Sequence, residues 1–261
     1  MAPFPIPPGI PRAALVTGAA GRLGRAIALA LAEAGFDVAL HRRHAAEAAE
    51  RTAADIRARG RAAVVLAAEL SDEAVVAGLL PAARHALGPV GVLVNNASAF
   101  ERDEWDTVTR ESWDRHMLPN LRAPLLLTQH FAQALPDTAE GVVINMIDQR
   151  VWSITPHFVS YTVSKAGLWA LTQAMALALA PRIRVNGIGP GPALPSPRQT
   201  AEQFARQSAS VPLRHGTSPE EVGRAVLAIL GLPSMTGQML ALDGGQHLQW
   251  APARAASPLQ E

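Results

Sequence analysis

The sequence predicts a single α/β domain in which a doubly wound sheet of about seven mostly parallel strands is covered by helices on both faces. Three observations lead to this prediction. Short apolar runs alternate with longer segments rich in Ala and Leu, as in parallel sheets whose two faces are buried. A chain of 261 residues is long enough for one large domain of this kind. No shift in composition and no linker divides it.

The individual elements follow from this alternation. The predicted strands are the apolar runs at 13–17, 37–40, 63–66, 90–95, 141–146, 183–188 and 238–242. The predicted helices lie near 22–34, 45–59, 72–87, 111–135, 158–180 and 219–230. The Pro-rich stretch that begins at Gly189 interrupts the pattern, and the segment at about 190–215 is predicted to be an irregular substrate loop. Residues 1–12 and 251–261 are predicted to be a flexible arm and tail on either side of the domain at 13–250.

The composition argues against several classes of function. A formal net charge of +1 gives no electrostatic reason to expect nucleic acid or an anionic membrane as a partner. The chain has no cysteine, and its eight histidines form no metal-binding spacing, so no metal site is predicted. No apolar run approaches the ~20 residues of a membrane span, and the start lacks the pattern of a signal peptide. We therefore expect a cytoplasmic protein.

Tyr161 and Lys165 are the only tyrosine and the only lysine of the chain. Their spacing of four residues places both side chains on one face of a helix. A nearby ammonium favours the phenolate and lowers the pKa of a phenol toward the range of an acid–base catalyst. The pattern predicts a catalytic pair, and the alternative is a half-buried tyrosine beside an unrelated surface lysine.

A glycine-rich turn, Thr-Gly-Ala-Ala-Gly-Arg-Leu-Gly, runs from Thr17 to Gly24 between the first strand and the first helix. Glycine permits a tight turn there, and the free N–H groups of a helix start can bind a pyrophosphate. The position of this turn on the first βα unit favours a Rossmann-like nucleotide site over a plain turn.

The second strand ends in His41-Arg42-Arg43 and has no acidic residue before Glu47. An NAD-binding site would place a carboxylate here for the ribose 2′-OH, whereas arginines suit a 2′-phosphate. NADP(H) is therefore the predicted cofactor, and the alternative is a solvated basic helix start.

Taken together, the glycine turn, Asn95-Asn96-Ala97 after the fourth strand and the Tyr161/Lys165 pair resemble the short-chain dehydrogenase/reductase family. Further matches are Asn120 within a helix, Pro190-Gly191 after the sixth strand, Thr236-Gly237-Gln238 and Asp243-Gly244-Gly245. The resemblance implies that Tyr161 exchanges a proton with the substrate and that Lys165 binds the nicotinamide ribose. It also implies that Asn120 holds a water molecule in the proton relay.

Two departures resemble the pteridine reductase branch of that family. Arg22 stands where the family turn usually has glycine, and Asp148 stands where the catalytic serine is usual. The Asn-Asn-Ala-Ser-Ala-Phe stretch that ends at Phe100 is similar to that branch too. The resemblance implies that Phe100 and the nicotinamide sandwich a flat ring, and that Ser98 and Arg22 contact substrate and cofactor. It further implies that Glu69-Leu70 border the adenine.

The predicted site therefore has three sets of residues. The catalytic set is Tyr161, Lys165, Asp148 and Asn120. The cofactor-binding set is Gly18, Arg22, Leu23, Gly24, His41, Arg42, Arg43, Glu69, Leu70, Asn96, Ala97, Ser98, Tyr161, Lys165, Pro190 and Gly191. The substrate-binding set is Arg22, Ser98, Phe100, Asp148 and Tyr161.

The function expected from these residues is NADPH-dependent reduction of a pteridine-type substrate. An NADP(H)-dependent reductase of another C=O or C=N compound is the first alternative, and a non-catalytic NADP(H)-binding sensor is the second. An enoyl reductase is disfavoured, because that branch spaces its tyrosine and lysine further apart. We expect a homotetramer built on the helices at 111–135 and 158–180, with Trp250 and the tail reaching a neighbouring subunit.

Overall fold

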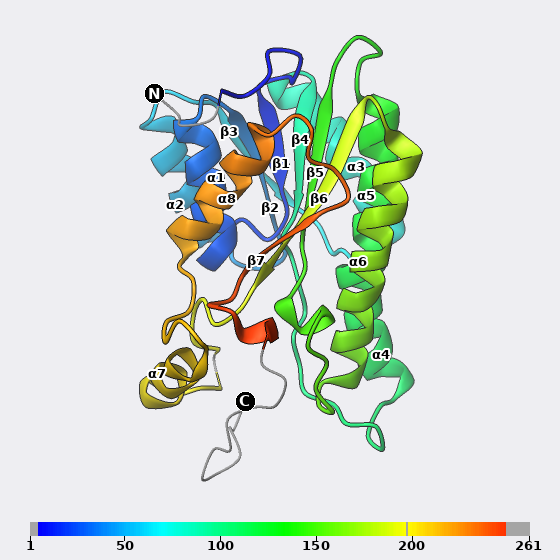
Figure 1. The fold of residues 1–261 in the computed structure, drawn as a ribbon. Helices are drawn as coiled ribbons and strands as arrows, with labels where there is room; N and C mark the ends of the chain where they lie inside the picture. Colours follow the sequence, from blue (N-terminus) through cyan, green and yellow to red (C-terminus); the bar gives the residue numbers. More distant parts are fainter. Residues whose placement is uncertain (1–4, 197, 249–261) are drawn as a thin grey trace.

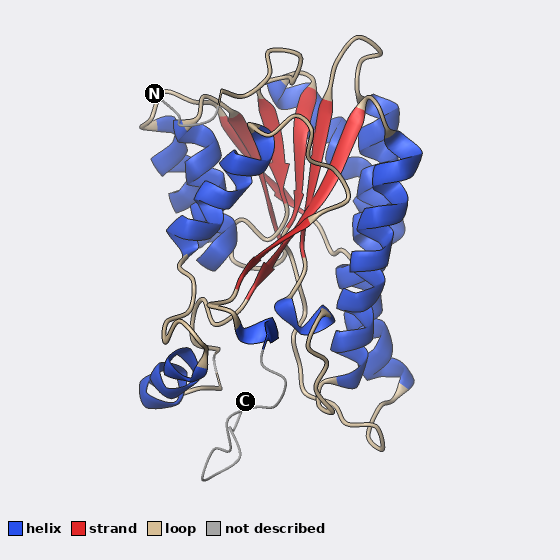
Figure 2. Cartoon of the chain, in the orientation of Figure 1, coloured by secondary structure: helices blue, strands red, loops and turns tan. Residues whose placement is uncertain are grey.

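The computed structural model describes residues 5–196 and 198–248, which fold around one seven-stranded sheet (Figures 1 and 2). The strand order is β3-β2-β1-β4-β5-β6-β7, and all six neighbouring pairs are parallel. The strands are β1 (Ala13–Val16), β2 (Asp37–Arg42), β3 (Ala63–Ala67), β4 (Val90–Asn95), β5 (Gly141–Met146), β6 (Ile183–Pro190) and β7 (Met239–Leu242). The predicted doubly wound α/β fold is confirmed, and the order of the strands reverses between β1 and β4.

Helices cover both faces of this sheet (Figure 1). One layer consists of α1 (Arg22–Glu33), α2 (Ala46–Arg57) and α8 (Pro219–Leu230). The other layer consists of α3 (Glu73–Leu87), α5 (Ala123–Ala134) and α6 (Val159–Leu179). Each layer buries its own hydrophobic cluster against the sheet, so the strands have no polar face.

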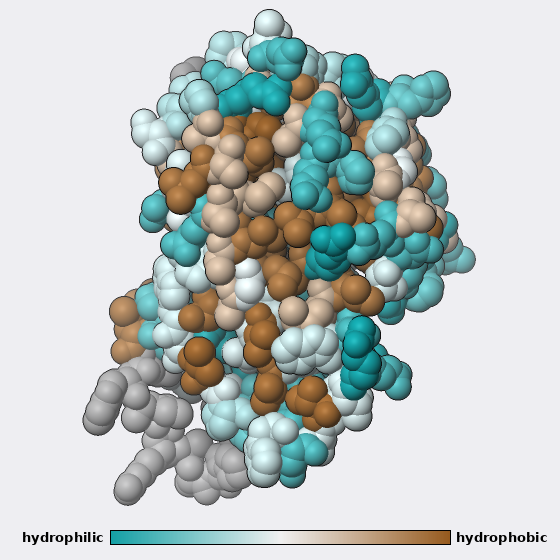
Figure 3. Space-filling view, turned by 90° about the vertical axis from the view of Figure 1, so that its right-hand side faces the viewer, coloured by the Kyte–Doolittle hydropathy of each residue, from teal (hydrophilic) through white to brown (hydrophobic). Residues whose placement is uncertain are grey.

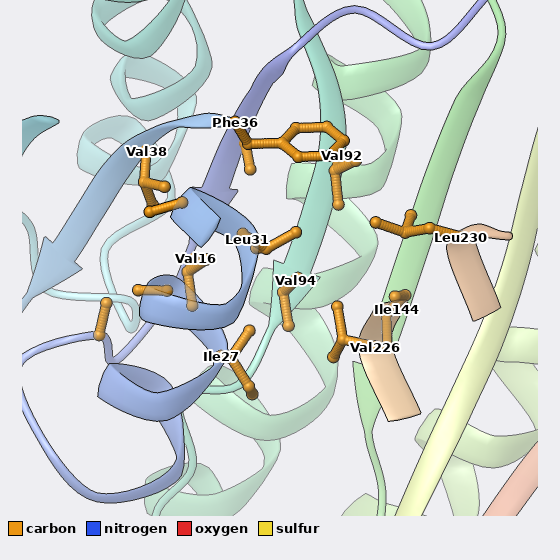
Figure 4. Packing of buried hydrophobic residues seen from close by; sticks show 14 of the residues in the cluster. Val16, Ile27, Leu31, Phe36, Val38, Val92, Val94, Ile144, Val226 and Leu230 are labelled. Carbon is orange, nitrogen blue, oxygen red and sulfur yellow. The ribbon is translucent and has the colours of Figure 1, made fainter. Parts of the chain in front are cut away.

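Successive side chains of a strand serve different clusters, because they point to opposite faces of the sheet. In β1, Val16 belongs to the cluster under α1 and α8, whereas Leu15 belongs to the cluster under α3 and α5. Figure 4 shows Ile27 and Leu31 of α1 facing the sheet beside Val16 and Val94. Two buried faces explain why the strands read as uninterrupted apolar runs in the sequence.

The helix predicted at 111–135 is divided by a π-helical turn. Helix α4 (Arg110–Met117) is followed by a π-helical segment at Leu118–Arg122, and α5 begins at Ala123. Pro119 has no N–H to donate, and its ring disfavours the regular α-helical bond at this point. Single π-helical turns inside α-helices often occur at functional sites. Asn120 lies at the centre of this one.

The segment at about 190–215 is not wholly irregular, because it contains a ten-residue helix, α7 (Ala201–Ser210). The Thr200 hydroxyl accepts a hydrogen bond from Gln203 N at 3.2 Å, and Thr200 N donates to Gln203 Oε1 at 2.7 Å. This capping box has a sequence signature, Thr-x-x-Gln, that predicts a helix start. None of the ten residues of α7, all of them described, is buried, so the helix stands away from the core (Figure 1).

Residues 5–12 pack against the domain and do not form the free arm expected from their prolines. Ile10 is 1% exposed, and Glu140 N donates a hydrogen bond to Gly9 O at 3.0 Å. A Cβ atom on Gly91 would lie 2.3 Å from Pro11 O, so this close approach requires glycine. Residues 1–4, Trp250 and the predicted tail at 251–261 lie outside the described residues.

Candidate active site

A cavity of about 290 Å³ lies at the carboxyl edge of the sheet, where the loops that follow β1, β4, β5 and β6 meet. Its walls include Arg22, Ser98, Asp148 and Pro190, one from each of these loops. Ligands of open α/β sheets bind in the crevice where the strand order reverses, and this cavity lies there. An open cleft of about 640 Å³ between α3 and α5 contains none of the predicted site residues.

Tyr161, Lys165 and Asp148 meet inside this cavity. The Tyr161 hydroxyl donates a hydrogen bond to Asp148 Oδ2 at 2.8 Å. Lys165 Nζ lies 5.8 Å from the centroid of the Tyr161 ring and donates to Met146 O at 2.8 Å. The other carboxylate oxygen, Asp148 Oδ1, accepts from Arg150 N at 2.8 Å and thereby caps the short 3-10 turn after β5. The carboxylate is thus fixed by the backbone on one side and by the phenol on the other.

Burial controls the charge of Lys165. The side chain is buried, and loss of hydration lowers its pKa from 10.5 to about 8, while the negative charge of Asp148 opposes this shift. Lys165 therefore remains an ammonium at neutral pH but titrates close to the physiological range. A cation of this kind beside the Tyr161 ring stabilises the phenolate that forms when the phenol gives up its proton.

The glycine turn after β1 has the geometry that a nucleotide site requires. Gly18 has a φ of 63°, and a Cβ atom on Gly24 would lie 2.2 Å from Gly18 O. Asn96 Nδ2 donates to Thr17 O at 2.8 Å and thereby ties β4 to this turn. Arg22 has a φ of 53°, a conformation that favours glycine, which gives a physical reason for the glycine usual there in the family.

His41 is buried beneath the turn and is not part of the cavity wall, and its contact with the cofactor stays a prediction. The ring is 2% exposed, and Gly18 N donates a hydrogen bond to His41 Nδ1 at 3.1 Å. Nε2 therefore carries the proton and donates to Ala68 O, also at 3.1 Å. Burial lowers the pKa of His41, which keeps the imidazole neutral and able to accept from Gly18. In this arrangement the His41 ring supports the turn.

Arg42 and Arg43 stand at the carboxyl end of β2, where Arg42 is half-buried and Arg43 is exposed. The Nε atom of Arg42 is buried and has no hydrogen-bond partner among the described residues. Arg43 Nη1 lies 3.8 Å from Glu69 Oε2, and both side chains are exposed, so this ion pair is weak. Leu70 is buried beside this end of the sheet. The exposed guanidinium of Arg43 beside that of Arg42 is suited in charge to the 2′-phosphate of NADP(H).

The side chain of Asn120 does not reach the catalytic pair. Its Oδ1 accepts from Ala99 N at 2.8 Å, and its Nδ2 donates to Ala99 O at 2.9 Å and to Ser164 Oγ at 3.1 Å. These bonds use the amide to hold the loop after β4 against α6. Both Nδ2 hydrogens and one Oδ1 lone pair are used in these bonds, and the water-holding role of Asn120 stays a prediction.

Phe100 lines the cavity, but both faces of its ring have neighbours. Phe158 stacks on it at a centroid distance of 4.7 Å with an interplanar angle of 7°. The guanidinium carbon of Arg198 lies 5.6 Å from the ring centroid, and Arg198 Nη2 donates to Phe100 O at 3.0 Å. Tyr161 meets the ring edge-on at 4.6 Å. A flat substrate can stack on Phe100 only if Arg198 moves aside.

Several residues of the cavity wall, among them Gln149, Phe204 and Gln207, were not predicted, nor was Arg198, which contacts Phe100. Gln149, directly after Asp148, is 7% exposed, and its Oε1 atom has no hydrogen-bond partner among the described residues. Arg198 belongs to the segment that holds α7, and Arg22 Nη1 donates to Pro195 O of the same segment at 3.1 Å. No local pattern marks these residues, because their position depends on how the segment folds back over the sheet.

The described residues contain no other obvious chemical centre. No group of three His, Asp or Glu side chains within residues 5–196 and 198–248 is placed to hold a metal ion. None of the helices in this part of the chain is long and apolar enough to cross a membrane.

Comparison with known proteins agrees with this geometry. The model of the family described as "Enoyl-(Acyl carrier protein) reductase" matches residues 18–247. Short-chain dehydrogenase/reductase eriH of Hericium erinaceus is 34% identical over an alignment of 243 residues that covers 89% of this chain and 96% of that protein. FolM alternative dihydrofolate reductase 1 of Brucella suis, solved with NADP, is 47% identical with a TM-score of 0.88, over 91% of this chain and 96% of that one.

The same enzyme of Brucella canis, also solved with NADP, is 46% identical with a TM-score of 0.89 and covers 93% of this chain and 97% of that one. The family model spans the glycine turn from Gly18, the Tyr161/Lys165 pair and the substrate loop. The chain therefore belongs to the short-chain dehydrogenase/reductase family.

Proposed function

We propose that the protein is an NADPH-dependent reductase of a pteridine-type substrate. The observation that carries this proposal is the 2.8 Å hydrogen bond from the Tyr161 hydroxyl to Asp148, which lies in a cavity beside Phe100. A serine at position 148 would donate a hydrogen bond to a substrate carbonyl, whereas a carboxylate accepts and passes on protons. The similarity to the two FolM enzymes solved with NADP supports the same substrate class and cofactor.

The residues at the nucleotide end fit NADPH. Arg42 and Arg43 would bind the 2′-phosphate, and the N–H groups of the turn at Gly18 would face the pyrophosphate. Lys165 would bind the nicotinamide ribose near the ends of β5 and β6. When bound, NADPH would supply the hydride that reduces a ring C=N bond.

The protein's own groups supply the proton. Reduction of a C=N bond adds a hydride to carbon and requires one proton at nitrogen. The Tyr161 proton passes to Asp148 Oδ2, and Asp148 gives it to the ring nitrogen. The phenolate left on Tyr161 is stabilised by the Lys165 ammonium until solvent restores the proton. Ser98 and Arg22 line the cavity and would contact the substrate.

The test is NADPH oxidation by the purified protein against dihydropterins, dihydrofolate and small ketones, with Tyr161→Phe as the control. We expect reduction of the pterins and no reduction of the ketones. Turnover of ketones alone would favour a family reductase of another C=O compound. NADPH binding without turnover of any substrate would favour the non-catalytic sensor.

We also propose that the protein is a homotetramer. Figure 3 shows apolar side chains gathered on the side of the molecule that carries α5 and α6. On α6, Val163 is 40% exposed and Leu177 is 84% exposed, which is unusual for large apolar side chains of one helix. Light scattering at micromolar concentration should give four times the chain mass, and a monomer of 27.5 kDa would refute the proposal. The cytoplasmic location stays a prediction from the sequence.

A further inference from the structure

We propose that His116 and Ser160 are positioning residues that hold the cavity wall carrying Ser98 and Phe100 in place for substrate binding. Neither side chain touches the cavity. The proposal rests on the proposed function, because it assigns the wall to the binding of a flat substrate ring. It concerns the segment at 98–103, which connects β4 to the region before α4.

Alternate residues of this segment are bonded to the helices behind it. Ala99 exchanges two hydrogen bonds with the Asn120 side chain, at 2.8 and 2.9 Å. Two residues later, Glu101 N donates to His116 Nε2 at 3.0 Å. Asp103 follows after two more residues, and its Oδ1 accepts from Ser160 N at 3.1 Å. The segment is therefore fixed at positions 99, 101 and 103.

The residues between these points face the other way, as in an extended chain. Ser98 and Phe100 line the cavity, and the guanidinium of Arg102 lies 5.7 Å above the Phe158 ring. If the segment shifted by one residue, Phe100 would point toward the helices, and Ala99 or Glu101 would point toward the cavity in its place. The three attachments therefore decide which side chains the substrate meets.

His116 and Ser160 lie in the middle of a chain of hydrogen bonds in which each group donates to the next, from Glu101 N–H to the Asp103 carboxylate. Because Glu101 N–H donates to His116 Nε2, the proton of the neutral ring is on Nδ1, which lies 2.7 Å from Ser160 Oγ and 3.1 Å from Ser112 O. The Ser160 hydroxyl donates in turn to the carboxylate of Asp103. Burial lowers the pKa of His116 and keeps the ring neutral, as the bond from Glu101 requires.

This chain is not a second catalytic centre. In a hydrolase, serine gives its proton to histidine, whereas the Ser160 hydroxyl donates to Asp103. His116 and Ser160 are both 0% exposed, and Asp103 is 5% exposed, so no substrate reaches them. The chain adjoins the active site instead, since Ser160 precedes Tyr161 and the His116 ring lies 5.9 Å from the Tyr161 ring.

The experiment compares His116→Leu with His116→Gln, Ser160→Ala and the control His85→Leu, which changes an exposed histidine of α3. Leucine removes the acceptor for Glu101 N–H, whereas the glutamine amide oxygen can replace it. We expect His116→Leu and Ser160→Ala to raise KM for dihydropterin about tenfold, the effect of one lost buried hydrogen bond. We expect kcat and the Kd for NADPH to change less than about twofold, and His116→Gln to recover most of the lost affinity.

Amide hydrogen exchange gives a readout that needs no substrate turnover. In His116→Leu, exchange should become faster at residues 97–103 and stay unchanged in the glycine turn. The positioning role is refuted if exchange at 97–103 is unchanged, if glutamine rescues nothing, or if KM, kcat and NADPH affinity decline together. If the unmodified protein does not reduce dihydropterin, the proposed function fails, and the exchange data still decide whether His116 holds the segment.

Discussion

The two ends of the active-site crevice are built in different ways. At the nucleotide end, backbone and buried side chains bond to one another, as Gly18 does with His41 and Asn96 does with Thr17. At the substrate end, Phe100 is 36% exposed, and the adjoining helix α7 contributes no buried residue. The catalytic pair lies between the two. A fixed cofactor site and catalytic centre are thus combined with a substrate side on which helix α7 buries none of its residues.

This difference predicts that substitutions in the middle of the crevice have the largest effects and that those at the substrate end have the smallest. Tyr161→Phe removes only the hydroxyl that donates to Asp148. We expect turnover to fall about 10²–10⁴-fold, because a general acid contributes a factor of that size. The Kd for NADPH, measured by fluorescence, should stay nearly unchanged. Retention of more than about a tenth of the activity would mean that the phenol is not the main acid.

Asp148→Ser tests whether the carboxylate sets the reaction. The variant keeps a hydrogen-bonding partner for Tyr161 but loses the group that relays the proton, so reduction of dihydropterin should fall by about 10²-fold or more. Weak reduction of ketones is the expected gain, because serine can donate to a carbonyl oxygen. Reduction of dihydropterin at the native rate would leave only a broader reductase function.

The same contrast explains how much the sequence could predict. The seven strands and the glycine turn were predictable because burial on both faces and the strict backbone geometry at Gly18 and Gly24 leave local patterns. The place of Tyr161 beside Lys165 followed from helix periodicity alone. The meeting of Tyr161 with Asp148 was expected only from a family resemblance, since thirteen residues and a chain reversal separate them.

The substrate end was less predictable. Helix α7 was missed although Thr200 and Gln203 mark its start, because the prolines before it suggested an irregular loop. The contact of Arg198 with Phe100 joins residues 98 positions apart and leaves no local pattern. His41 was assigned to the cofactor because it begins the basic run after the second strand, and the burial of this one member depends on how β2 packs.

The lowered pKa of Lys165 predicts that activity declines at alkaline pH. Its pKa of about 8 lies below the usual 10.5 because the side chain is buried, so raising the pH through 8 removes its charge in the free enzyme. The value of kcat/KM, which reports the free enzyme, should therefore fall about tenfold per pH unit above that point. The stability of the fold changes with pH in the opposite direction. Between the folded pKa of about 8 and the ordinary value of 10.5, Lys165 is protonated in the unfolded chain but mostly neutral in the folded protein. The contribution of Lys165 to stability therefore rises with pH over this range. A kcat/KM that is flat up to pH 10 would contradict the assignment.

At the nucleotide end, Arg42 and Arg43 should determine the choice of cofactor. We expect NADPH to bind at least about tenfold more tightly than NADH, a modest factor for a charge-assisted contact with the 2′-phosphate. Arg42→Ala should remove most of this preference by weakening NADPH and leaving NADH unchanged. Arg51→Ala, on the exposed face of α2, is the control for a general loss of positive charge. Equal affinities of the unmodified protein for the two cofactors would refute the prediction.

At the substrate end, Arg198→Ala should have a small effect that, unlike the other substitutions, strengthens substrate binding. Phe158 already covers one face of the Phe100 ring, and the Arg198 guanidinium lies over the ring at 5.6 Å. A pterin that stacks on Phe100 must displace this cation, and an exposed cation–π contact is worth ~0.5–1 kcal/mol. Its removal should therefore lower KM for dihydropterin by about two- to fivefold. Arg206→Ala removes a cation from the exposed surface of α7 and should leave KM unchanged. If Arg198→Ala instead raises KM, this arginine binds the substrate directly. The substrate loop then contributes to the binding site beside Phe100 and does not compete with the substrate.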